Sequence, residues 1–202
     1  MKLYYSPGAC SLSPHIALRE AGINVELKKV DLGAKKVADG GDYTAVNPKG
    51  YVPALELPSG EVLTEGPAIV QYVADQNPDS KLAPKAGTLE RYRLQEWLNF
   101  ISTELHKSFS VFFNKSATTE WKEGVKANLG RRFDFLSAKL AGQPYLMGNQ
   151  FTVADGYLFT VLNWCGFAGI QLGNWPTLVE YHARVAARPK VQEAMKAEGL
   201  VK

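Results

Sequence analysis

Residues 1–22 read MKLYYSPGACSLSPHIALREAG and predict a short β-strand followed directly by a helix. The strand is expected at Lys2–Tyr5, before a Ser-Pro-Gly turn. The helix is expected over residues 11–22, with Gly22 as its C-terminal stop. Cys10 therefore lies where a strand ends and a helix begins.

The following residues continue this α/β pattern. A second strand is expected at 25–30, and the charged, glycine-rich stretch 33–42 is expected to be a loop or a loose helix. Residues 47–57 and 61–64 flank a short turn with glycine and predict a β-hairpin. A helix is expected over 66–77. The order combines one parallel strand pair with an antiparallel hairpin.

In the second part of the chain the apolar residues recur with a different period. Two stretches rich in proline and glycine, 77–80 and 83–87, indicate a linker. After them apolar residues recur only at helical spacing. Helices are expected over residues 88–113, 121–140, 153–169, 177–188 and 190–199. We therefore expect an α/β domain at 1–80, a linker at 81–87 and an all-α helical bundle at 88–202.

Composition and charge agree with two units and exclude several classes of protein. The chain has 202 residues, 23 basic and 20 acidic side chains, and a net charge of +3. That charge is too small to predict nucleic-acid binding. It is also uneven, because residues 1–80 carry 7 basic and 10 acidic side chains and the remainder is basic.

Targeting and metal signals are absent from the sequence. The N-terminus has no apolar run typical of a signal peptide, and the most apolar stretch, 157–172, is broken by Asn163. Two cysteines do not make a disulfide framework. The three histidines form no metal motif. We expect a cytoplasmic protein without metal, membrane or nucleic-acid partners.

Cys10 is the first candidate for chemistry. A helix N-terminus carries unpaired N–H groups and a partial positive charge, which favour a thiolate. The local pattern Cys10-Ser11-Leu12-Ser13 lacks a second thiol, so an external thiol would have to resolve any disulfide. The alternative is a small buried cysteine, as we expect for Cys165 in its apolar helix.

Two further segments could bind a ligand. A cis bond between Val52 and Pro53 would turn the backbone N–H and C=O of Val52 towards an extended peptide, although a trans bond is the commoner form. Glu65 and Gly66 begin a helix, where amides suit a carboxylate and Glu65 could hold an ammonium group. The alternative for Glu65 is an acidic residue that only complements the helix dipole.

Polar residues also follow the long helix of the second part. Asn99, Thr103 and His106 stand at i, i+4 and i+7 and are expected to line one face. The alternative for His106 is a structural histidine. Thr152 and Asp155 form a variant of the capping box, which we interpret as a structural motif and not as a ligand site.

Four segments together resemble the glutathione S-transferase family, in its bacterial beta class. They are MKLYYSPGACSLSPHIALREAG, NPKGYVPAL, LTEGPAIVQYVAD and FTVAD, and they span essentially the whole chain in order. The resemblance implies a thioredoxin-like N-terminal domain, an all-helical C-terminal domain, a homodimer and glutathione as co-substrate. The cysteine at position 10 is the mark of the beta class.

The resemblance assigns glutathione contacts to nine residues: Cys10, Lys35, Val52, Glu65, Gly66, Asn99, Thr103, Glu104 and His106. It makes Cys10 and His106 catalytic and Pro53 a cis proline. It also implies that Lys35 approaches the glycine carboxylate. Asn99, Thr103 and Glu104 are implied to contact glutathione in part across the dimer interface. Tyr5 and Ser11 match positions that activate the thiol in other classes and rank below Cys10.

The expected activity is conjugation of glutathione thiolate to small hydrophobic electrophiles, in detoxification. Thiol–disulfide exchange or reductive dehalogenation through Cys10 is a second activity. The helix N-terminus and His106 are expected to lower the pKa of the thiol, and Phe109, Phe113 and Trp164 to line the electrophile pocket. The alternatives are a non-catalytic interaction module and a glutathione-dependent isomerase, although the serine-rich run of the latter is missing.

Overall fold

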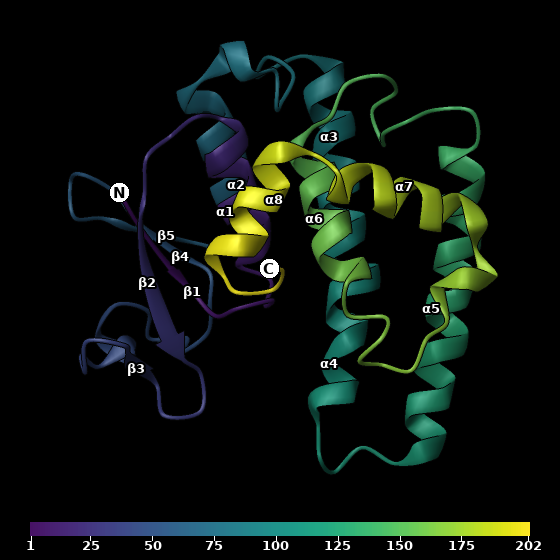
Figure 1. Ribbon diagram of the computed structural model, residues 1–202, viewed down its shortest axis with the longest axis horizontal. Coiled ribbons are helices and arrows are strands. Elements are labelled where there is room, and N and C mark those ends of the chain that lie inside the picture. Colours follow the sequence, from purple (N-terminus) through teal and green to yellow (C-terminus); the bar gives the residue numbers. More distant parts are fainter.

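The computed structural model describes residues 1–202 and contains a five-stranded sheet beside a bundle of helices (Figure 1). The strands are β1 Lys2–Tyr5, β2 Glu26–Asp31, β3 Lys36–Val37, β4 Ala54–Glu56 and β5 Val62–Thr64. Their order is β3-β2-β1-β4-β5, with β1 and β2 parallel and the other pairs antiparallel. Helices α1 Leu12–Glu20 and α2 Gly66–Gln76 complete this part. The expected thioredoxin-like N-terminal domain with a helical C-terminal domain is confirmed.

The strand β3 lies within residues 33–42, for which the sequence predicts a loop or a loose helix. Asp31 Oδ1 accepts hydrogen bonds from the backbone N–H groups of Gly33 and Ala34, at 2.8 and 2.9 Å, and so forms a tight turn. Val37 then pairs with Val30 and is buried in a small cluster beside the sheet. A two-residue strand is too short to produce a recognisable alternation.

The helical part comprises α3 Leu89–Phe100, α4 Lys107–Phe113, α5 Thr119–Leu140, α6 Val153–Leu162, α7 Pro176–Ala186 and α8 Pro189–Ala197. The helix expected over 88–113 is continuous, but its centre, Ile101–His106, is a π-helix. The helix expected over 153–169 ends at Leu162. The residues after it form turns up to Gly169, which adopts a φ of +68°. None of the helices has both the length and the apolar character needed to cross a membrane.

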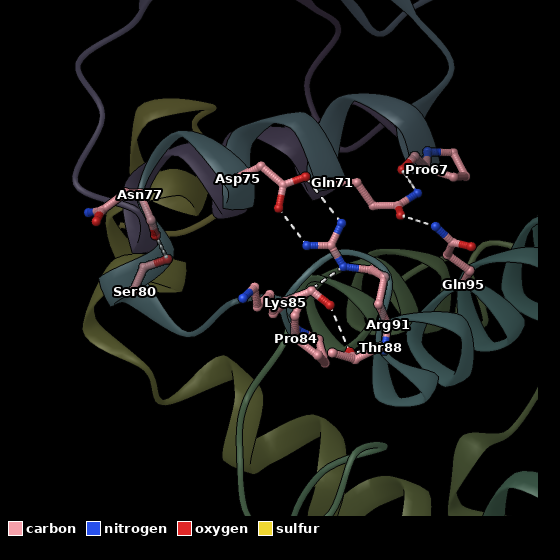
Figure 2. Close-up of polar contacts among 10 residues, drawn as sticks. All are labelled: Pro67, Gln71, Asp75, Asn77, Ser80, Pro84, Lys85, Thr88, Arg91 and Gln95. Atoms are coloured by element: carbon pink, nitrogen blue, oxygen red, sulfur yellow. Dashed lines mark hydrogen bonds and ion pairs between the residues drawn. The ribbon is translucent and has the colours of Figure 1, made fainter.

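The buried guanidinium of Arg91 joins the linker to the first part of the chain (Figure 2). Its Nη1 and Nη2 donate to the two carboxylate oxygens of Asp75 on α2, and its Nε donates to the carbonyl of Pro84 at 2.7 Å. Gln95 on α3 donates to Gln71 on α2 at 2.9 Å. One hydrophobic core of 39 buried residues also runs through both parts, so the domain boundaries 1–80, 81–87 and 88–202 stay a prediction.

Helix α6 lies at the centre of this core, and all ten of its residues are buried. Its N-terminus has the predicted capping box, in which Asp155 Oδ2 accepts from Thr152 N at 2.8 Å and Thr152 Oγ1 at 3.0 Å. Asp155 Oδ1 accepts from Leu146 N at 2.9 Å and Tyr181 Oη at 3.0 Å. The capping residues therefore connect α6 to two other segments.

The C-terminal residues hold the loop that carries Cys10. Glu198 follows α8, which packs against α1 (Figure 1). Its Oε1 lies 2.8 Å from His15 Nδ1, and its Oε2 accepts from the backbone N–H of Gly8 at 2.9 Å. The side chains of His15 and Glu198 are fully buried. A Cβ at Gly8, whose φ is +69°, would lie 3.3 Å from Leu200 Cδ2.

Replacing Glu198 by alanine is expected to lower the free energy of unfolding by about 3 kcal/mol, because a buried imidazole and a backbone N–H lose their partner. Urea unfolding measures this loss. Glu193→Ala, on the preceding helix α8, is the control, since Glu193 pairs only with Lys190 at the surface. Equal stability of the two variants would contradict the expectation.

Candidate functional site

Cys10 lies in the turn between β1 and α1, two residues before the helix begins. Its half-buried thiol donates to the carbonyl of Val52 at 3.2 Å. The hydroxyl of Ser11 is buried and bonds to the backbone N–H and C=O of Ser6, at 3.1 and 3.2 Å. Ser11 therefore closes the turn, while the Cys10 sulfur faces the segment before Pro53. The Val52–Pro53 bond is cis.

Two adjoining cavities meet at Cys10, His106 and Lys107. The smaller has a volume of about 190 Å³ and is lined also by Tyr51, Val52, Pro53, Glu65, Gly66, Pro67, Ser102 and Tyr157. The larger has a volume of about 420 Å³ and is lined also by Pro7, Gly8, Ala9, Leu32, Ser110, Phe113, Asn163, Trp164 and Phe167. The site thus joins a smaller cavity, called the polar cavity, to a larger one that contains Phe113, Trp164 and Phe167 and is called the aromatic cavity.

One of the three aromatic residues expected to line the larger cavity does not line it. Phe113 and Trp164 line it as expected, but Phe109 is completely buried and packs beneath Trp164 with ring centroids 5.6 Å apart. Phe167 takes its place at the surface, stacked on Phe113 at 4.8 Å. Phe109 follows the buried Leu105 by four positions and therefore lies on the face of the helix that packs into the core.

The electrostatics of the thiol differ from the expectation. Burial raises the pKa of Cys10 to about 11, although backbone N–H groups and Lys107 act in the opposite direction. Burial lowers the pKa of His106 to about 4, and Lys107 lowers it further. His106 is therefore neutral near pH 7 and supplies no positive field. The helix N-terminus therefore does not lower the pKa of Cys10, because desolvation outweighs it.

Glu65 stands at the N-terminus of α2 with an unusual backbone. Its φ is +69°, a region that residues other than glycine rarely adopt and that clusters at functional sites. The carboxylate accepts from Lys49, whose hydrogen bond holds the pKa of Glu65 below its usual range. Tyr51 Oη lies 3.4 Å from the same oxygen, Oε1. The second oxygen, Oε2, has no protein partner and lies at the polar cavity.

Lys35 lies just outside the polar cavity. Its Nζ donates to the carbonyl of Gly50 at 2.7 Å, next to the segment that leads to Val52. Its side chain is exposed, so the ammonium group remains accessible to an anion at that end.

Asn99, Thr103 and Glu104 do not line either cavity within the chain. Asn99 and Thr103 are exposed neighbours, with Thr103 Oγ1 donating to the Asn99 carbonyl at 3.0 Å, and Glu104 pairs with Arg132 at 2.7 Å. Asn99 and Thr103 were expected to share one face with His106, but they are exposed and line neither of the cavities that His106 lines. The Lys107 N–H bonds to Ser102 O, five residues back, so the π-helix rotates His106 away from that face.

The lining residues that were not predicted from the sequence include Ser102, Lys107, Tyr157 and Phe167. Tyr157 Oη lies 2.6 Å from His106 Nδ1. A lone phenol hydroxyl inside the apolar α6 was the available signal, because a buried hydroxyl needs a partner. Lys107 carried no signal beyond its position next to His106.

The fold combines a thioredoxin-like domain with a helical domain, and the thiol of Cys10 lies at cavities lined by residues of both. Family models for the N-terminal and C-terminal domains of glutathione S-transferase match residues 8–76 and 100–189. Glutathione S-transferase GstA of Escherichia coli O157:H7 is 46% identical over 200 residues, which cover 99% of this chain and all of the relative. The chain belongs to the glutathione S-transferase family.

Similar solved structures indicate the class within this family to which the chain belongs. A ternary complex of BphK, a bacterial GST, is 60% identical, with a TM-score of 0.97 over 99% of this chain and 100% of that one. A sphingomonad glutathione S-transferase complexed with glutathione and a beta-class enzyme of Sphingomonas chungbukensis are each 49% identical, with TM-scores of 0.96 over both full lengths. The chain is a glutathione transferase of the bacterial beta class.

Proposed function

We propose that the chain binds glutathione in the polar cavity and transfers its thiolate to a small hydrophobic electrophile in the aromatic cavity. The observation that carries this proposal is that the two cavities share Cys10, His106 and Lys107. A thiol at this junction would stand next to both reactants. Proximity and exclusion of water would then supply much of the rate acceleration.

Glutathione would lie along the polar cavity in an extended form. The free Oε2 of Glu65 suits its ammonium group, and the N-terminus of α2 at Gly66 suits its γ-glutamyl carboxylate. The backbone of Val52 would pair with the cysteinyl unit. Lys35 would approach the glycine carboxylate. Binding would displace the Cys10 thiol from the Val52 carbonyl, because both donors need the same oxygen.

The second proposed activity is thiol–disulfide exchange at Cys10. The Cys10 thiolate attacks the glutathione sulfur of a mixed disulfide between glutathione and another thiol, forms a Cys10–glutathione disulfide and releases the other thiolate. A glutathione thiolate then attacks the glutathione sulfur of the Cys10–glutathione disulfide, forms glutathione disulfide and releases the Cys10 thiolate. The CxxS pattern requires this external thiol, because Cys165 is buried elsewhere. Reductive dehalogenation would use the same Cys10–glutathione disulfide.

We also propose a cytoplasmic homodimer that acts in detoxification. The dimer is supported by a partly exposed aromatic cluster on α3 and α5, in which the rings of Trp97, Phe100 and Phe135 lie within 6.1 Å of one another. Asn99, Thr103 and Glu104 would then contact glutathione across the interface. Light scattering across a concentration series tests this proposal, and a monomer at every concentration would refute it.

Replacing Glu65 by glutamine is expected to raise the KM for glutathione by about tenfold and to leave kcat almost unchanged, because the ammonium loses a charged partner. Steady-state kinetics with 1-chloro-2,4-dinitrobenzene measures both constants. Glu61→Gln is the matched control, since Glu61 is exposed and bonds only to Ser59. A fall in kcat at unchanged KM would contradict the assignment of Glu65 to binding.

The non-catalytic alternative makes a different prediction. An interaction module would show no turnover with any model electrophile and no affinity for immobilised glutathione. Binding and turnover by the purified chain would exclude it.

A further inference from the structure

The hydroxyl of Tyr157 contacts His106, one of the three residues that line both cavities. Tyr157 is 3% exposed and belongs to the buried helix α6, whereas His106 lies on the π-helix. Tyr157 Oη and His106 Nδ1 are 2.6 Å apart. The imidazole packs edge-on against Tyr157, at 5.8 Å and 85°, and against Trp164, at 5.0 Å and 65°. Two aromatic rings therefore fix the plane of the imidazole.

The geometry of this hydrogen bond indicates its direction. A separation of 2.6 Å is short for an N–H donor and ordinary for a hydroxyl donor. Both groups are neutral near pH 7, since burial raises the pKa of Tyr157 and lowers the pKa of His106. The phenol O–H therefore donates to Nδ1. A neutral imidazole has one hydrogen on nitrogen, so Nε2 carries it.

The second nitrogen of His106 remains available to a ligand. Nε2 has no hydrogen-bond partner in the chain, and it is not among the buried polar atoms that lack one. It is therefore accessible, and His106 lines both cavities. The charged groups that face His106 are Lys107 and Glu65, and neither bonds to it.

We propose that Tyr157 is a positioning residue that holds His106 in the Nε2–H form, so that the neutral imidazole donates a hydrogen bond to the sulfur of bound glutathione. Only the identity of the sulfur rests on the proposed function. The opposite tautomer would present a lone pair to a thiolate and repel it. A neutral donor stabilises the thiolate without giving it a proton, because the imidazole has no excess proton to transfer.

Nitrogen-15 NMR of the histidine-labelled, ligand-free chain tests the tautomer directly. Two other histidines serve as internal references. His15 Nδ1 faces the Glu198 carboxylate and must carry hydrogen, whereas His182 Nε2 faces Asn163 Oδ1 and must donate there. The His106 signals, assigned with His106→Gln, are expected to resemble those of His182. Hydrogen on Nδ1 of His106 would overturn the proposal, whatever the behaviour of any variant.

Tyr157→Phe then tests the role of the hydroxyl. It is expected to give a mixture of His106 tautomers, to raise the pKa of the bound glutathione thiol by about one pH unit, and to lower kcat about tenfold at pH 6.5. The KM for glutathione should stay within about twofold. Tyr181→Phe is the matched control, because it also removes a buried phenol hydroxyl but acts on Asp155, away from His106.

The outcomes separate the two proposals. An unchanged His106 tautomer and an unchanged thiol pKa in Tyr157→Phe would overturn the role of Tyr157. A chain that binds no glutathione would refute the proposed function, while the ligand-free spectra would still decide the tautomer.

Discussion

Cys10→Ala is expected to lower the rate of glutathione–disulfide exchange at least about a hundredfold and the rate of conjugation less than about tenfold. Exchange needs a protein sulfur that forms and loses a disulfide bond. Conjugation needs only the glutathione sulfur, which is proposed to receive its hydrogen bond from His106 and not from Cys10. Cys165 cannot replace Cys10, because it is 2% exposed and burial raises its pKa to about 12.

Intact-protein mass spectrometry after incubation with oxidised glutathione is the companion measurement. The native chain and Cys165→Ala should each gain one glutathione, about 305 Da, and Cys10→Ala should gain none. An adduct on Cys10→Ala would show that Cys165 reacts. Equal loss of exchange and conjugation would show that Cys10 serves both reactions, and the proposed separation would fail.

Asp155→Ala is expected to lower the free energy of unfolding by about 5 kcal/mol, the largest effect on stability among the variants considered. Asp155 accepts four hydrogen bonds, from Leu146 N, Thr152 N, Thr152 Oγ1 and Tyr181 Oη. Its removal leaves buried donors without a partner in three segments. Because α6 also carries Tyr157, glutathione conjugation should be lost together with the fold.

Urea unfolding of three variants tests this prediction. Thr152→Ala removes one cap and should cost about 1 kcal/mol. Asp134→Ala is the control for a lost aspartate, since Asp134 forms a single exposed bond with Trp175. A loss in Asp155→Ala no greater than that in Thr152→Ala would mean that Asp155 acts only as a helix cap.

The features that could be predicted from the sequence are those determined by residues that lie close together along the chain. The strand Lys2–Tyr5 is observed with the predicted bounds, because the Ser-Pro-Gly turn ends it. The capping box of Thr152 and Asp155 joins residues three positions apart, so its chemistry is visible in the sequence. The two-part division of the secondary structure followed from a change in hydrophobic period.

The features that were missed depend on distant contacts. The π-helix that turns His106 towards α6 has no local marker, and Tyr157 is 51 positions away from His106. The burial that raises the pKa of Cys10 comes from elements that the sequence does not place next to it. The resemblance supplied the site residues, but it did not supply the direction of these pKa shifts.

The contact between Glu198 and Gly8 spans 190 positions and has a consequence for biosynthesis. During translation the Cys10 turn emerges long before the carboxylate that holds it. The turn can therefore be fixed by Glu198 only after α8 and the residue that follows it have been made, so the structure around Cys10 forms late in the synthesis of the fold.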